Sequence, residues 1–85
     1  MSHHTVMSAK EPKVKGCIDD CVKSGNSCVE TMSHCLHMGG KHAEPSHITL
    51  LANCAEVCRT SADFMLSGSE FDSEICNVCA AVCEK

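Results

Sequence analysis

Nine cysteines are the residues of this 85-residue chain whose type and spacing indicate chemistry. Four of them lie between Cys17 and Cys35 at intervals of four, seven and seven residues, which return to one side of an α-helix. Three pairs in the chain are four residues, or one helical turn, apart, namely Cys17/Cys21, Cys54/Cys58 and Cys79/Cys83. Two sulfur atoms at that spacing can share one ion, and soft thiolate ligands select Cu(I), Zn(II) or iron–sulfur clusters.

The spacing favours several Cu(I) ions over a single zinc ion. Structural zinc sites usually join CxxC pairs on turns into a tetrahedron of four ligands, and here only Cys76 and Cys79 have that spacing, within a helical segment. Buried cysteine also behaves as a small hydrophobic residue, which explains one or two of them but not a stripe repeated on three segments. A row of thiols along a helical bundle therefore predicts many ions in one core.

Three helical segments must position these thiols. We expect the first over residues 14–38, ended by Gly39-Gly40, and the second over residues 46–66, with Pro45 in its first turn. The third begins near Asp72 or Ser73, either of which can cap it. Residues 1–13 are polar and without period, which predicts a flexible tail before a cysteine-rich bundle domain over residues 14–85.

The helical periods and short connections predict an all-α fold, an antiparallel helical bundle with all nine cysteines facing the core. The first segment places its apolar residues and cysteines on one arc, made of Val14, Cys17, Ile18, Cys21, Val22, Gly25, Cys28, Val29, Met32, Cys35 and Leu36. The second does the same with His47, Leu50, Leu51, Cys54, Val57, Cys58, Ser61, Ala62, Phe64 and Met65. The third has two faces to bury, one of Cys76, Cys79 and Cys83 and one of Ile75, Val78 and Val82.

Composition excludes several classes of function. The net charge of −4 comes without a basic patch, which argues against nucleic acid and anionic membrane surfaces as partners. No apolar run has the length of a transmembrane helix or a signal sequence, so we expect a cytoplasmic protein whose thiols stay reduced. We expect no enzyme, because no nucleophile–base pair, phosphate loop or carboxylate pair is visible.

Disulfides and thiol redox chemistry are the competing interpretations. A disulfide scaffold requires an oxidising compartment and usually an even number of cysteines, whereas this chain has nine. A redox enzyme needs an exposed cysteine of low pKa beside a cation, and the CxxC at Cys76 and Cys79 has Glu74 and Asn77 around it instead. A structural or sensory thiol protein, held together by Zn(II) or by disulfides, remains the alternative to a Cu(I) store.

The cysteine positions and the connector together resemble the bacterial copper storage family of cysteine-rich four-helix bundles. The resemblance covers roughly residues 14–85 and is carried by three stretches, residues 31–45, 50–69 and 76–84. It implies a homo-oligomer whose inward cysteines hold many Cu(I) ions, supplied and removed by copper donor and acceptor proteins. Members of the family continue through a longer third helix and a fourth helix, so this chain resembles either a fragment of such a protein or a natural short form that completes its bundle by association.

The predicted function is cytosolic Cu(I) storage or buffering, with several ions per chain and copper as the partner. The predicted metal ligands are the nine thiols of Cys17, Cys21, Cys28, Cys35, Cys54, Cys58, Cys76, Cys79 and Cys83, with His47 and Met65 at the two ends of the row. His47 and Met65 are expected to take up ions, against the alternatives of a partly exposed first-turn residue and of core filling. His34 and His37 are expected to be solvated, and His3 and His4 offer a further amino-terminal copper motif.

Overall fold

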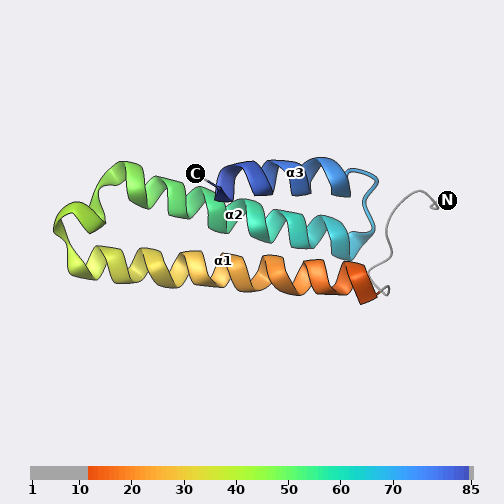
Figure 1. Ribbon diagram of the computed structural model, residues 1–85, viewed down its shortest axis with the longest axis horizontal. Coiled ribbons are helices and arrows are strands. Elements are labelled where there is room, and N and C mark those ends of the chain that lie inside the picture. Colours follow the sequence, from red (N-terminus) through yellow and green to blue (C-terminus); the bar gives the residue numbers. More distant parts are fainter. Residues whose placement is uncertain (1–11, 85) are drawn as a thin grey trace.

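A computed structural model describes residues 12–84, which form three α-helices and a short connecting 3-10 helix. The elements are α1 (Pro12–Met38), η1 (Gly40–Ala43), α2 (Pro45–Ser67) and α3 (Asp72–Cys83), and the part of the chain so described contains no strand (Figure 1). The predicted all-α bundle is confirmed. No helix within residues 12–84 is long and apolar enough to cross a membrane.

The three α-helices run antiparallel to their neighbours, with α2 between the other two (Figure 1). α1 packs along α2, α3 packs on α2, and the backbones of α1 and α3 do not come into contact. The molecule is accordingly long and thin, with extents of 51 × 19 × 16 Å. Thiols from all three helices can therefore meet only along the sides of α2.

Glycines make the two turns. Gly39 and Gly40 follow α1 with φ of 75° and 58°, a left-handed backbone that residues with a side chain adopt at a cost. Gly68 has φ of 69° after α2, where its N–H donates to the Met65 carbonyl and the Ser69 N–H donates to the Phe64 carbonyl. This is the Schellman arrangement, so the sequence signals at both turns are confirmed.

The helix starts differ slightly from the predicted ones. α1 begins at Pro12, two residues before the predicted Val14, because proline suits the first turn of a helix. The predicted tail, with His3 and His4, otherwise lies outside the described residues. α2 begins at Pro45 itself. Neither Asp72 nor Ser73 caps α3, since Phe71 occupies the N-cap position and no side chain bonds there.

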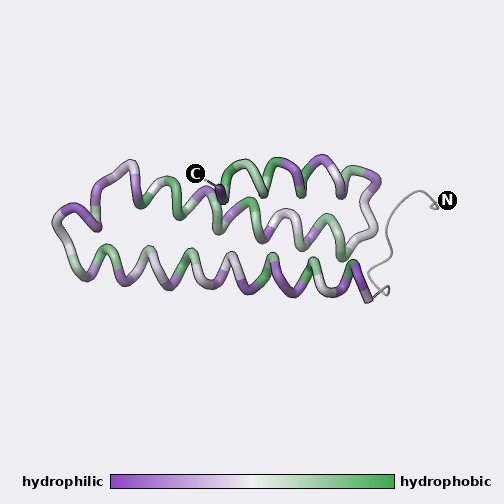
Figure 2. Tube along the Cα trace, viewed as in Figure 1, coloured by the Kyte–Doolittle hydropathy of each residue, from purple (hydrophilic) through white to green (hydrophobic). Residues whose placement is uncertain are grey.

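The buried stripe is narrower than the predicted arc. In α1 only Val14, Ile18 and Cys35 are buried, whereas the predicted core residues Cys17, Val22, Val29 and Leu36 are exposed. The reason is that α2 packs along α1 whereas the backbone of α3 does not approach it, and one close neighbour buries a narrow strip of a helix. Figure 2 shows hydrophobic residues distributed along all three α-helices. In α2 the predicted face is confirmed at Cys54, Cys58, Ser61, Ala62 and Met65, while His47 is exposed.

Candidate metal centre

The centre of the thiol row lies between α2 and α3. The sulfur of Cys58 is 3.6 Å from that of Cys79 and 3.6 Å from that of Cys83. The sulfurs of Cys54, Cys58 and Cys83 all lie within 4.8 Å of one another, a separation that one metal ion can span. Cys58 is thus the residue where thiols from two helices converge.

Gly25 allows α1 to approach this cluster. An added Cβ at Gly25 would lie 3.4 Å from the Cβ of Cys58 and 3.5 Å from the Ala55 carbonyl, so the two helices are in close contact there. Cys28, one turn further along α1, packs against the buried Cys54, Cys58 and Cys79. Thiols of α1 therefore join the cluster that the thiols of α2 and α3 form.

Two of the cysteines form a disulfide. Cys54 and Cys83 are bonded, with a Cα–Cα distance of 5.2 Å, and the other seven cysteines are free. The expectation that all nine thiols stay free differs from the structure at this pair. The same proximity that permits the bond also places both sulfurs in the three-sulfur group, so the pair supplies metal ligands only after reduction.

Burial keeps the central thiols protonated. It raises the pKa of Cys58 to about 12, and the hydrogen bond and charge of Cys79 add to that effect. Burial also raises the pKa of Cys21 to about 11, with Cys79 and Cys76 contributing. Because metal binding requires thiolates, an ion that binds these residues near neutral pH must release protons. A cation among the sulfurs also removes the repulsion that opposes their ionisation.

Each end of the row has a different composition. At the α1–α2 turn, the Nε2 atom of His47 is 3.4 Å from the Sγ atom of the buried Cys35. His34, His37 and His42 are exposed nearby in the chain. At the opposite end, Met65 is fully buried with Val14, Ile18 and Ala62, and Cys21 and Cys76 pack against this apolar group. These apolar surroundings are what we expect if Met65 only fills the core.

Not all predicted ligands lie inside. Cys35, Cys54, Cys58 and Cys79 are buried, Cys21, Cys28 and Cys76 are half-buried, and Cys17 and Cys83 are exposed. The inward placement predicted for Cys17 is therefore wrong for this chain by itself, because the backbone of α3 does not come close enough to α1 to cover this residue. Sequence reasoning also missed Asp72, which is buried on α3. The signal was its spacing of four residues from Cys76, which places both on one face.

The helices and the sulfur cluster define a thiol-rich helical bundle able to hold metal. The sequence profile of the copper storage protein family matches residues 10–85, and the chain belongs to that family. It is a family of binding proteins rather than enzymes.

Two relatives are similar over most of the chain. The crystal structure of the Nmul_A1745 protein from Nitrosospira multiformis is 47% identical in sequence, with a TM-score of 0.81 over 84% of this chain and 66% of that one. The uncharacterized cysteine-rich protein YhjQ of Bacillus subtilis (strain 168) is 31% identical over 70 residues, which are 82% of this chain and 65% of that protein. The chain thus spans about two thirds of the length of each relative.

Proposed function

We propose that this protein stores or buffers copper as Cu(I), with several ions per chain held by the thiolates of its nine cysteines. The observation that carries the proposal is the convergence of thiols on Cys58, whose sulfur lies 3.6 Å from two sulfurs on α3 and against whose cluster Cys28 of α1 packs. One structural ion needs four ligands, whereas this row offers more than twice that number. Soft thiolates and the scarcity of other ligand types in the core favour Cu(I).

A competition between metals tests this proposal. Reduced protein is mixed anaerobically with Cu(I) and Zn(II) together, separated from free metal, and analysed for bound metal. We expect several copper ions and at most one zinc ion per chain. Retention of more zinc than copper would contradict storage of Cu(I) and would favour the alternative of a bundle held by zinc.

The Cys54–Cys83 disulfide favours the second alternative, a bundle held by a disulfide. The protein is isolated without reductant, alkylated and analysed by mass spectrometry, which distinguishes a reduced Cu(I) store from a bundle held by a disulfide. A store in the cytoplasm, where thiols are kept reduced, is expected to show nine alkylated cysteines in the metal-free protein. Seven alkylated cysteines would match the disulfide-bonded form.

His47 is proposed as a ligand that takes up ions at the α1–α2 turn. Its imidazole is exposed and its Nε2 atom contacts the buried Cys35 sulfur at 3.4 Å, so it connects solvent to the row. We expect His47→Ala to load Cu(I) more slowly than wild type in stopped-flow experiments with a chromogenic Cu(I) chelator as donor. His37→Ala, which removes an exposed histidine of α1, is the matched control and should load normally. Equal rates for both variants would rule out the uptake role.

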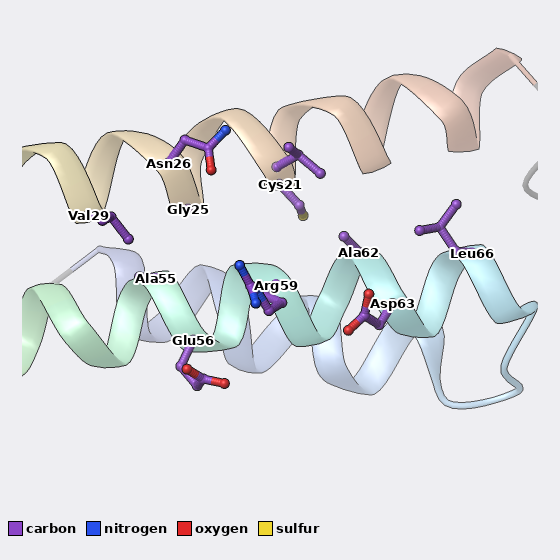
Figure 3. A pocket seen from close by; sticks show the side chains of 11 residues that line it. Cys21, Gly25, Asn26, Val29, Ala55, Glu56, Arg59, Ala62, Asp63 and Leu66 are labelled. Carbon is purple, nitrogen blue, oxygen red and sulfur yellow. The ribbon is translucent and has the colours of Figure 1, made fainter.

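Self-association is proposed through the face of α1 and α2 that Figure 3 shows, behind which α3 lies. A groove of about 380 Å³ runs between the two helices there, and Val22, Val29 and Leu66 line it although they are 45%, 51% and 58% exposed. Arg59 lies on α2 between Glu56 and Asp63 along the groove (Figure 3). A second copy related by a two-fold axis can cover the apolar residues and pair Arg59 with an acidic residue of its partner.

Light scattering on Val29→Glu tests the association. The substitution places a charge in the apolar part of the groove, so we expect wild type to be oligomeric at micromolar concentration and the variant to be monomeric. Thr31→Glu, on an exposed part of α1 outside the groove, is the control and should keep the wild-type mass. A wild-type monomer with full helix content would contradict the association.

We propose that the protein exchanges copper with donor and acceptor proteins in the cytoplasm. Cu(I) is transferred between thiolate ligands, and the exposed ligands that a partner can reach are the imidazole of His47 and the thiols of Cys17 and, after reduction, Cys83. The donor and the acceptor are expected to present cysteine or methionine ligands of their own, because these match the softness of Cu(I).

A further inference from the structure

Asp72 carries a buried carboxylate that has no hydrogen-bond partner among residues 12–84. It is the first helical residue of α3 and only 3% exposed, and neither of its carboxylate oxygens has a hydrogen-bond partner within residues 12–84. Buried carboxylates are normally paired with a cation or with several N–H donors, because their desolvation is strongly unfavourable. A side chain held in this way requires a physical reason.

Helix capping and ion pairing do not supply that reason. Phe71, not Asp72, occupies the N-cap position of α3, and no side chain bonds there. Burial raises the pKa of Asp72, and the charged neighbour that adds to this shift is Glu74, which has the same sign. Among residues 12–84, the charge that acts on this carboxylate is therefore negative.

Two thiols complete the surroundings of Asp72. Cys76 follows it by one turn on the same face of α3 and packs at the end of the core that contains Val14 and Ile18. Cys17 precedes Ile18 directly and follows Val14 by about one turn on α1, so it lies at the same end of the bundle. After burial itself, Asp72 and then Cys17 are the neighbours that most raise the pKa of Cys76, so each lies close enough to act on that thiol. A single cation among these three acidic groups would neutralise all three.

We propose that Asp72, Cys76 and Cys17 form a separate site for a borderline divalent cation, Zn(II), at the end of the bundle remote from the Gly39–Gly40 turn. Carboxylate oxygen and thiolate sulfur are both ordinary zinc ligands, whereas soft Cu(I) has little affinity for carboxylate. Cys17 is exposed, which leaves a fourth position open to water. The three ligand atoms are not a group within 4.8 Å of one another in the metal-free structure, so side chains rotate when the ion binds. When Zn(II) occupies this site, Cys17 and Cys76 are the two of the nine thiols that bind it, and the site does not depend on copper storage by the other seven.

Cobalt(II), a spectroscopic substitute for zinc, tests the site in the fully reduced full-length protein. Wild type is expected to bind its first equivalent of Co(II) with the visible bands of a tetrahedral thiolate complex. Asp72→Asn, which keeps the shape of the side chain, should lower the affinity for the first Co(II) ion at least tenfold and change the visible spectrum of the complex. Cys17→Ser should have a similar effect. Glu84→Gln, an exposed change of the same kind at the opposite end of α3, is the matched control and should leave Co(II) binding unchanged.

Thermal unfolding gives a second readout that does not rely on spectra. Zn(II) should raise the melting temperature of wild type and of Glu84→Gln but not that of Asp72→Asn, since a ligand stabilises only the folded state that binds it. Metal-free Asp72→Asn should melt above metal-free wild type at neutral pH, because an unpaired buried charge is removed. If the metal-free variant is this stable, its loss of metal binding cannot result from a failure to fold.

The outcomes separate this site from the copper store. Copper capacity, measured by native mass spectrometry, should be the same in Asp72→Asn and wild type, and a low capacity in both would refute the store without affecting the zinc site. Equal Co(II) affinity in Asp72→Asn and wild type would overturn the zinc site. So would a first Co(II) equivalent that is lost in Cys58→Ser and retained in Cys17→Ser.

Discussion

Replacing Met65 with alanine is expected to lower the free energy of unfolding of the reduced, metal-free protein by about 2–5 kcal/mol. Met65 has no exposed surface and is the largest of the fully buried side chains. It packs with Val14, Ile18 and Ala62 where α1 and α2 meet, so its removal leaves a cavity that few neighbours can fill. In a domain whose total stability is roughly 5–15 kcal/mol, such a loss is large. Denaturant unfolding followed by circular dichroism measures it.

Met65→Leu distinguishes packing from metal binding at the same position. Leucine restores the volume and is expected to cost less than about 1.5 kcal/mol, but it has no sulfur. If Met65 only fills the core, the leucine variant takes up Cu(I) at the wild-type rate and to the wild-type capacity. A stable leucine variant with slower uptake or fewer ions would instead show that the thioether is a copper ligand.

Cys58→Ser is expected to have the largest effect of any single cysteine substitution on Cu(I) capacity. The Cys58 sulfur is 3.6 Å from the sulfurs of Cys79 and Cys83 and belongs to the three-sulfur group with Cys54. A hydroxyl at this point is a poor ligand for Cu(I), so ions shared with both neighbours lose a thiolate. We expect a loss of at least one ion per chain and weaker retention of those next to it.

Cys17→Ser is the matched control for this experiment. Cys17 is exposed at the end of the row, so its loss should reduce Cu(I) capacity less than the loss of Cys58. Both variants are titrated with Cu(I) under reducing conditions and analysed for ions per chain and for competition with a Cu(I) chelator. Equal losses would mean that the thiols bind independently and that Cys58 does not join the two helices into one cluster.

Local sequence signals predicted the helices well because each end has its own chemical cause. Gly39-Gly40 ends α1, Pro45 begins α2 and Gly68 closes it, and these features act within a few residues along the chain. Cysteine spacing likewise predicted the convergence of Cys54, Cys58 and Cys79, which lie in one buried group.

Burial depends on which helices are neighbours, and spacing along one helix does not contain that information. Cys17 lies on the predicted stripe but is exposed, because the backbones of α1 and α3 do not come close enough to enclose it. The sequence equally could not pair Cys54 with Cys83, since 29 residues separate them. Asp72 was read as a helix cap by its residue type, whereas its burial follows from the way α3 packs on α2.

Native mass spectrometry of the reduced protein titrated with Cu(I) is the most direct measurement of copper storage. Soft ionisation preserves bound ions, so the spectrum gives the number of ions per chain and the mass of the assembly together. The sulfur row predicts that each chain takes up several Cu(I) ions and that the ions remain bound in an oligomer. Saturation at one Cu(I) ion per chain would contradict a store and would leave a single structural metal site.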